Sequence, residues 1–341
     1  MPTPFLTICI PSFNRPRELC NLLASIDCSP MEVEVVICED LAPKRDEVRT
    51  KVSAFASTSP YKIRYNENTI NRGFDGNLRR LVECATGEYV IFMGDDDLFV
   101  AGALDPFIGF LKQHRDKPYV LRSYLIEHSD RRREYFRYLP NSKVLPSGES
   151  TVSWLFKRSV TICGFTISRE KALQFATSDL DGTLLYQVYL MSQVCLESES
   201  VYCDIPIVHA IQSFRGDKPM FGNAETEKGR YTPGTVSHDN SINFTKAYFE
   251  VAEYLDEQHG THLKQLVRIE LSKYSYPFLS IQRKRGLFSF LHYAKRLETE
   301  AELGCTTYYH AYKWALVLLG ERNCDWLIRF IKQKLGHTPN F

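Results

Sequence analysis

The stretch NENTINRGFDGNLRRLVECATGEYVIFMGDDDL, residues 66–98, is the part of the chain that best predicts its fold. It predicts a strand end, a helix over 75–86 and a buried strand that ends in three acids, Asp95–Asp97. Three carboxylates at the end of a buried strand repel one another unless a cation or solvent relieves them. Carboxylate oxygens suit Mg²⁺ or Mn²⁺. The alternative is an acid-rich turn, or an N-cap for the helix expected over 101–113.

The residues before this stretch repeat the same alternation of strand and helix. Strands are predicted at FLTICIPSF (5–13), VEVVICED (33–40) and KIRYNE (62–67), with helices over 15–26 and 43–57 between them. This order is typical of an α/β fold, a Rossmann-like, mostly parallel central sheet with flanking helices. We therefore expect the carboxyl ends of the strands to line one crevice.

Polar residues stand at the ends of three of these strands. They are Ser12, Asn14, Glu39, Asp40 and Asp95–Asp97. Strand ends need polar turn residues in any protein, and for a single acid that interpretation is favoured. Polar clusters on three strands favour a binding site.

The second half of the chain has a mixed pattern. Strands are predicted at 119–127, 134–140 and 201–211, and helices at 151–158 and 183–196. A polar loop with several Gly and Pro residues follows, and beyond 240 the pattern is mostly helical. We expect a catalytic domain over 1–215, a flexible loop or lid over 216–239 and a helical region over 240–341.

Composition excludes several classes of protein. The net charge of +1 gives no basic field of the kind that binds nucleic acid. The 10 Cys residues include no Cys-x-x-Cys pair, so reduced, mostly buried thiols are expected rather than disulfides or a zinc site. The first residues lack the pattern of a signal peptide, and no apolar run reaches the roughly 18 residues of a membrane span. These features predict a cytoplasmic protein.

Four motifs resemble those of the family 2 glycosyltransferases, which have the GT-A fold. They are TICIPSFNR (7–15), VVICED (35–40), the Asn71–Asn77 segment, and ATGEY with the acids that follow it (85–97). The resemblance is firm over 5–110 and looser over 110–215, and it is closest to O-antigen and capsule sugar transferases. It implies an inverting, metal-dependent transfer of a sugar from a nucleotide-diphosphate sugar to a hydroxyl of a glycan, lipid-linked in those relatives.

The resemblance also implies roles for individual residues. Those expected to bind the donor are Pro11, Ser12, Phe13 and Arg15 beside the nucleotide, Glu39 and Asp40 facing its base, Asn71, Gly73 and Asn77 against the nucleotide-sugar, and Asp95 and Asp96. A divalent metal, Mn²⁺ or Mg²⁺, is expected on Asp97 or Asp95, because Gly94 replaces the first acid of the family pattern. The metal neutralises charge on the departing diphosphate. The same replacement allows an alternative, a nucleotide-sugar-binding protein that has lost catalysis.

The family places its catalytic base in an acidic motif near the start of a helix, where this chain has Asp179-Leu180-Asp181. Asp181 is the predicted base and Asp179 the second choice, because the acceptor hydroxyl needs a carboxylate within hydrogen-bond reach. One alternative is that Asp181 only N-caps the helix. A remote alternative is the Asp-x-Asp-Gly-Thr nucleophile motif of haloacid-dehalogenase-like phosphatases. That motif must follow a strand, whereas the preceding residues have helical spacing.

Three further predictions concern the later part of the chain. His209 is a candidate metal ligand, although a lone His after an apolar strand is more often structural. Arg215, in the glycine-bearing loop, is expected to fold over the diphosphate, or else to lie in a solvated loop. Basic and apolar residues over 282–297 predict a helix that contacts anionic lipid, or else a helix packed on the core.

Overall fold

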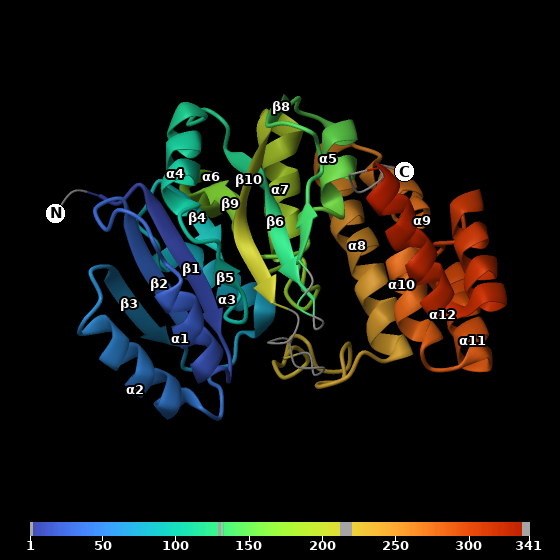
Figure 1. Ribbon diagram of the computed structural model, residues 1–341, viewed down its shortest axis with the longest axis horizontal. Coiled ribbons are helices and arrows are strands. Elements are labelled where there is room, and N and C mark those ends of the chain that lie inside the picture. The colour runs from blue at the N-terminus through green and yellow to red at the C-terminus, as the bar shows by residue number, and fades with distance from the viewer. Residues whose placement is uncertain (1–2, 129–130, 132, 212–219, 336–341) are drawn as a thin grey trace. The chain divides into compact units, whose positions relative to one another are not determined.

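The computed structural model describes residues 3–128, 131, 133–211 and 220–335. The chain divides into two compact units, Met1–Gly234 and Thr235–Phe341 (Figure 1). The first unit is built around a mixed sheet and the second is helical. Each unit is described by itself.

One sheet runs through the first unit, and its described strands follow the order β3-β2-β1-β4-β9-β6-β10-β5, with β7 on β6 and β8 on β10. The strands are β1 (Leu6–Ser12), β2 (Val33–Glu39), β3 (Lys62–Glu67), β4 (Tyr89–Phe92), β5 (Leu98–Phe99), β6 (Tyr119–Glu127), β7 (Arg133–Phe136), β8 (Lys143–Leu145), β9 (Phe165–Ser168) and β10 (Ser200–Ile211). β3, β2, β1 and β4 are parallel. The predicted α/β fold with a mostly parallel sheet is confirmed.

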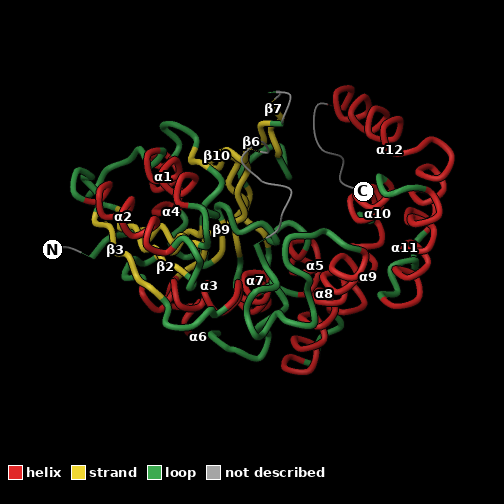
Figure 2. Tube along the Cα trace, turned by 90° about the horizontal axis from the view of Figure 1, so that it is seen from below, coloured by secondary structure: helices red, strands yellow, loops and turns green. Residues whose placement is uncertain are grey.

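Helices cover both faces of this sheet. They are α1 (Pro16–Ala24), α2 (Arg45–Ala56), α3 (Gly73–Cys84), α4 (Leu104–Gln113), α5 (Glu149–Phe156), α6 (Arg169–Gln174) and α7 (Tyr186–Glu197). Figure 2 shows α1, α2 and α4 on one face and α3, α6 and α7 on the other. Because both faces are covered, β2 is buried along its whole length, which explains the apolar run Val35–Cys38 within it.

Two features of the sheet were not predicted from the sequence. β9 lies between β4 and β6 and runs antiparallel to both. The short β5 follows the acidic turn directly and pairs with β10. Both strands have four residues or fewer, too short for a periodic pattern to identify them. β9 and β5 extend the sheet beyond the four parallel strands. Residues 161–163, which precede β9, lie next to the carboxyl end of β4.

The parallel register brings the strand ends into line. Ser12 pairs with Glu39, and Glu39 pairs with Glu67 on the next strand. The first residues after β1, β2 and β4 therefore emerge at one edge of the sheet, where the sequence predicts a crevice.

The second unit consists of α8 (His238–His259), α9 (Leu263–Lys273), α10 (Tyr276–Arg283), α11 (Leu287–Glu300) and α12 (Thr307–Leu335). Gly320 interrupts α12 with a positive φ of 73°. The prediction of one helix over 282–297 is wrong, because α10 ends at Arg283 and a turn precedes α11. Within α11, Phe290 and Leu297 are buried, as expected of a helix packed on the core. Among the helices described, none has both the length and the apolar character needed to cross a bilayer.

Candidate functional site

A pocket of about 460 Å³ opens at the carboxyl ends of β1, β2 and β4. Its volume is within the range of small-molecule sites. The predicted donor-binding residues on its wall are Pro11, Ser12, Phe13, Arg15, Asp40, Asn71, Gly73, Asn77, Asp95 and Asp96. Phe74, Gly94, residues 161–163 and four residues of the 220–227 segment complete the wall. The structure thus brings together predicted donor-binding residues from four separate segments of the sequence.

An acidic pair and one guanidinium occupy the wall of the pocket. Arg15 Nη1 lies 3.0 Å from Asp95 Oδ1 and 2.9 Å from Asp96 Oδ2. Asp95 is 5% exposed and also accepts a hydrogen bond of 3.4 Å from the Phe13 amide. Burial raises the pKa of Asp95 to about 7; Arg15 opposes this shift and Asp96 adds to it. One cation thus serves two adjacent carboxylates, and further positive charge would stabilise both in the ionised form.

The donor set of this acidic turn fits a divalent cation held partly by a ligand. Over the described ranges, no group of three or more His, Cys, Asp or Glu residues could hold a metal ion. Mg²⁺ sites commonly use one or two carboxylates and take their other oxygens from substrate phosphates and water. Asp95 and Asp96 provide two carboxylates facing the pocket. They fit a cation that arrives with a diphosphate.

The two other predicted metal ligands do not line the pocket. Asp97 is fully buried. His209, on β10, pairs through its backbone with Leu98 and places Nε2 3.3 Å from Glu127 Oε2. Of the acidic triplet, the structure therefore presents only the first two members to the pocket.

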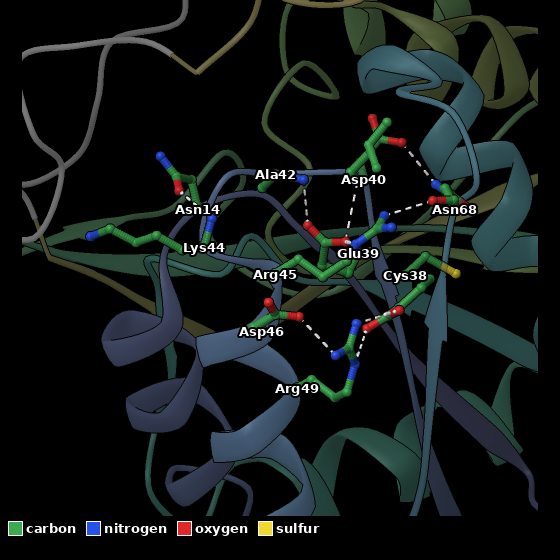
Figure 3. Close-up of polar contacts among 12 residues, drawn as sticks. Asn14, Cys38, Glu39, Asp40, Ala42, Lys44, Arg45, Asp46, Arg49 and Asn68 are labelled. Carbon is green, nitrogen blue, oxygen red and sulfur yellow. Dashed lines mark hydrogen bonds and ion pairs between the residues drawn. The ribbon is translucent and has the colours of Figure 1, made fainter.

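Glu39 and Asp40 are adjacent in sequence but have different surroundings (Figure 3). Glu39 is fully buried, accepts hydrogen bonds from the amides of Leu41 and Ala42, and forms an ion pair with Arg45. This corrects the prediction that it faces the nucleotide: Glu39 holds the connection between β2 and α2. Asp40 does line the pocket, and burial raises the pKa of its carboxyl.

Asn68, which sequence reasoning missed, connects the pocket wall to the helix behind it. Its Nδ2 donates to Asp40 Oδ1 at 2.8 Å and to Asn77 Oδ1 at 2.9 Å. Asn77 donates in turn to the Cys38 carbonyl at 3.1 Å. Arg45 donates to the Asn68 carbonyl (Figure 3). These bonds fix the end of β2 against α3 and thereby orient Asp40.

Glu227 is a second residue that sequence reasoning missed. It is 2% exposed and lines the pocket. Its Oε1 accepts a hydrogen bond of 2.8 Å from the Phe74 amide in the first turn of α3, and its Oε2 accepts one of 2.5 Å from the Gly222 amide. The carboxylate thus satisfies an amide that the helix itself leaves unpaired. An acid in a polar loop gives no sequence signal for this role.

Gly73 is required where the 220–227 segment meets α3. Its φ is +70°, and a Cβ there would lie 2.8 Å from Glu227 Oε1 and 2.9 Å from the Ala224 Cβ. A side chain at this position would both strain the backbone and displace the segment. Gly73, which the family pattern identifies, therefore permits the 220–227 segment to approach α3 closely.

Asp181 lies in a cavity of about 490 Å³ that adjoins the pocket and shares Asn71 and Asn223 with it. Arg79 on α3 binds both carboxylate oxygens, at 2.7 and 2.8 Å. Asp179 is exposed and lines neither space. α6 and a turn precede Asp179, so the strand required by a phosphatase nucleophile motif is missing from 169–185.

The N-cap interpretation of Asp181 is wrong. Leu185 is the N-cap residue of α7, and no side chain of its own caps the helix. Asp75 on α3 does so instead: its Oδ2 accepts from the amides of Gly182 and Leu184 at 2.9 and 2.8 Å, and its Oδ1 accepts from Tyr186 at 3.0 Å. Burial raises the pKa of Asp75 to about 7. This cap comes from 107 to 111 positions away, so local sequence could not reveal it.

Arg215 and residues 216–219 of the predicted lid lie outside the described residues. In the described part, Met220, Phe221, Asn223 and Glu227 line the pocket. The segment from 220 to 227 thus forms one wall of the site.

Comparisons with known proteins agree with this geometry. A crystal structure of S. aureus TarS 1–349 in complex with UDP-GlcNAc is similar over 97% of this chain and 92% of that chain, with 14% identity and a TM-score of 0.54. The mannosyltransferase PcManGT from Pyrobaculum calidifontis, in complex with GDP-Man and Mn²⁺, is similar over 94% and 88%, with 15% identity and a TM-score of 0.52. At these identities the likeness establishes the fold. None of the curated proteins compared with the chain matches it.

The sequence model of glycosyl transferase family 2 matches residues 7–179. This segment is just over half of the chain, and it contains the three strand ends and the acidic turn that build the pocket. The phosphatase interpretation of Asp179–Thr183 is therefore wrong, and the chain belongs to glycosyl transferase family 2 and is a glycosyltransferase of that family.

Proposed function

We propose that the pocket binds a nucleotide-diphosphate sugar and that the protein transfers its sugar, with inversion, to a hydroxyl of a glycan. The observation that carries the proposal is the position of the acidic pair, Asp95 and Asp96, in a pocket formed by strand ends of a family 2 member. TarS and PcManGT were solved with UDP-GlcNAc and GDP-Man, which supports a donor of this chemical class.

Asp95 and Asp96 would hold Mn²⁺ or Mg²⁺, with the donor diphosphate as a further source of ligands. The complex of PcManGT with Mn²⁺ supports the choice of metal. When bound, the cation neutralises negative charge on the leaving diphosphate. Arg15, which contacts both carboxylates, is positioned to bind a phosphate oxygen once the cation shares them. Asp97 stays a prediction from the sequence alone, and its burial argues for a supporting role.

The acceptor would enter the adjoining cavity, where Asp181 serves as the base. In this reaction the acceptor oxygen attacks the anomeric carbon, the bond from that carbon to the diphosphate oxygen breaks, and the hydroxyl proton passes to the carboxylate. Because Asn71 and Asn223 line both spaces, a donor and an acceptor would meet there. Asp181 is favoured over Asp179 because it lies in the cavity.

The acceptor class is a lipid-linked glycan of a surface polysaccharide, with the enzyme acting in the cytoplasm at the inner face of the membrane. This part rests on the resemblance of the chain to O-antigen and capsule sugar transferases.

Isothermal titration calorimetry with UDP and GDP tests the donor proposal. We expect Mn²⁺ to tighten binding of one of them at least about tenfold, since a cation held by Asp95 and Asp96 would offset the negative charge of the diphosphate. Asp95→Asn should abolish this gain, whereas Asp116→Asn, at an exposed acid, should not. Binding that is equally tight with and without Mn²⁺ would overturn the metal assignment.

The base is tested separately, by release of nucleoside diphosphate from a panel of sugar nucleotides with alkyl glycoside acceptors. Asp181→Asn should lower turnover by about 10²–10⁴-fold and leave nucleotide affinity unchanged. Asp179→Asn, at the exposed neighbour, is the matched control and should retain turnover. Unchanged turnover of the Asp181 variant would overturn the base assignment.

A further inference from the structure

The last helix of the chain exposes an apolar stripe. After Gly320, α12 exposes Trp326 (61%), Leu327, Phe330 (45%) and Ile331. At 100° per residue these four side chains span an arc of about 140° on one side of the helix. Trp326 and Phe330 stack on each other, with ring centroids 5.7 Å apart. Such a contiguous set of large apolar side chains marks an interaction site.

The charges exposed beside this stripe are positive. Arg322 and Arg329 are exposed and lie next to Trp326 on the helical projection, both on the side away from Ile331. The two acids of the same segment face other groups: Glu321 lies 3.1 Å from Lys284 Nζ, and Asp325 accepts a hydrogen bond of 2.5 Å from the Tyr276 hydroxyl. The stripe is therefore apolar, with two cations along the border next to Trp326.

These features favour a lipid surface over a protein partner. Trp and Phe next to cations are the residues that settle at the boundary of anionic headgroups and acyl chains. A second copy that paired through the same stripe would bring its own Arg322 and Arg329 to a surface that already carries these charges. Since no described helix can cross a bilayer, such contact would be peripheral.

We propose that this surface docks the protein on an anionic membrane through the stripe Trp326, Leu327, Phe330 and Ile331 and the adjacent Arg322 and Arg329. The apolar side chains insert among the acyl chains, and the cations bind lipid phosphates. The inference rests on the proposed function in one respect: a lipid-linked acceptor would explain why the protein docks on a membrane. Its test contains neither donor nor acceptor, so its failure leaves the transfer reaction untouched.

Co-sedimentation of the full chain with phosphatidylcholine vesicles, with and without about 30 mol% phosphatidylglycerol, tests the proposal. We expect binding to the anionic vesicles that is at least about tenfold tighter than to the neutral ones, and that weakens as salt rises. Arg322→Gln with Arg329→Gln should remove most of this preference. Trp326→Ser with Phe330→Ser should lower binding about tenfold or more.

Met31→Ser is the matched control, because Met31 is an exposed apolar residue of the first unit. It should bind vesicles like the unaltered chain, and circular dichroism checks that every variant is folded. Absence of binding to the anionic vesicles overturns the proposal, as does binding that the Trp326 and Phe330 changes leave intact. A dimer in light scattering that those changes dissolve assigns the stripe to a second copy instead.

Discussion

At the scale of single residues, the pocket is organised around shared charges. One guanidinium, Arg15, contacts the carboxylates of Asp95 and Asp96, and a further cation would stabilise the ionised form of both. The arrangement suits an anionic ligand that brings its own cation. The cation would bind the two carboxylates, and Arg15 could then contact the anion. This is what a metal-bound diphosphate supplies.

Glu227 provides a prediction at this scale. Glu227→Ala removes the acceptor for the Phe74 and Gly222 amides and releases the 220–227 segment that forms one wall of the pocket. Because an unpaired buried amide costs about 1–3 kcal/mol, nucleotide affinity should fall about tenfold or more. Calorimetric titration of UDP or GDP with Mn²⁺ measures the change.

Glu225→Ala is the control for this experiment. Glu225 is on the same segment, but it is exposed and pairs with Lys228. An equal loss of affinity in both variants would mean that the segment responds to any change, and the role assigned to the Glu227 carboxylate would then be wrong.

Adjacent acids illustrate what the sequence can predict about residues. Glu39 and Asp40 both end a strand, and the pattern placed both at the site. Only Asp40 lines the pocket, because Glu39 folds back onto the amides of Leu41 and Ala42. Leu41 has a positive φ of 54°, which is uncommon for a leucine and could not be predicted from the residue type. The position of a site thus follows from strand order, whereas the direction of each side chain depends on the turn.

At the scale of elements, the loop before α7 is held by a helix distant in sequence. Asp75 accepts three amide hydrogen bonds from this loop and from the first turn of α7. The loop also carries Asp181, whose partner Arg79 is one turn further along α3. One helix therefore positions both the loop and its carboxylate.

Asp75 also makes the stability of the fold depend on pH. Its folded pKa of about 7 is above the value of about 3.9 in an unfolded chain, so the folded state holds this proton between those pH values. Its contribution to the free energy of unfolding is complete below pH about 4 and is lost as the pH rises through about 7. Asp181 and Glu227 are the neighbouring acids that add to the shift.

Urea unfolding of the protein and of Asp75→Asn at several pH values measures this effect. The difference in unfolding free energy between the two should decrease as the pH rises from about 4.5 to about 7.5. A difference that is independent of pH would mean that Asp75 is ionised in the folded state throughout this range.

Elements also set the limit of prediction from the sequence. The strands and helices up to residue 113 have clear periods, and the structure reproduces them within a few residues. β9 and β5 are too short to have a period, and the cap of α7 depends on a residue of another helix. These features could not be read from the period of a single segment.

At the scale of the whole molecule, the chain has two compact units with separate buried cores. We expect two transitions in differential scanning calorimetry of the full chain. A nucleoside diphosphate with Mn²⁺, at about 100 times its dissociation constant, adds about 2.7 kcal/mol to the unit that binds it. The corresponding midpoint should rise by about 5–10 °C and the other should stay in place. A rise of both midpoints would contradict the assignment of the ligand to the first unit.

The contact between Phe74 and Glu227 has a consequence for biosynthesis. The two residues are 153 positions apart, and the ribosome makes the strands and α3 long before the segment that closes over them. A nascent chain that stops short of Glu227 contains every residue of the matched family segment, yet it lacks one wall of its pocket and leaves the Phe74 amide uncapped. Under the proposed function, competence to bind the donor is therefore acquired late in translation, after most of the sheet can already have formed.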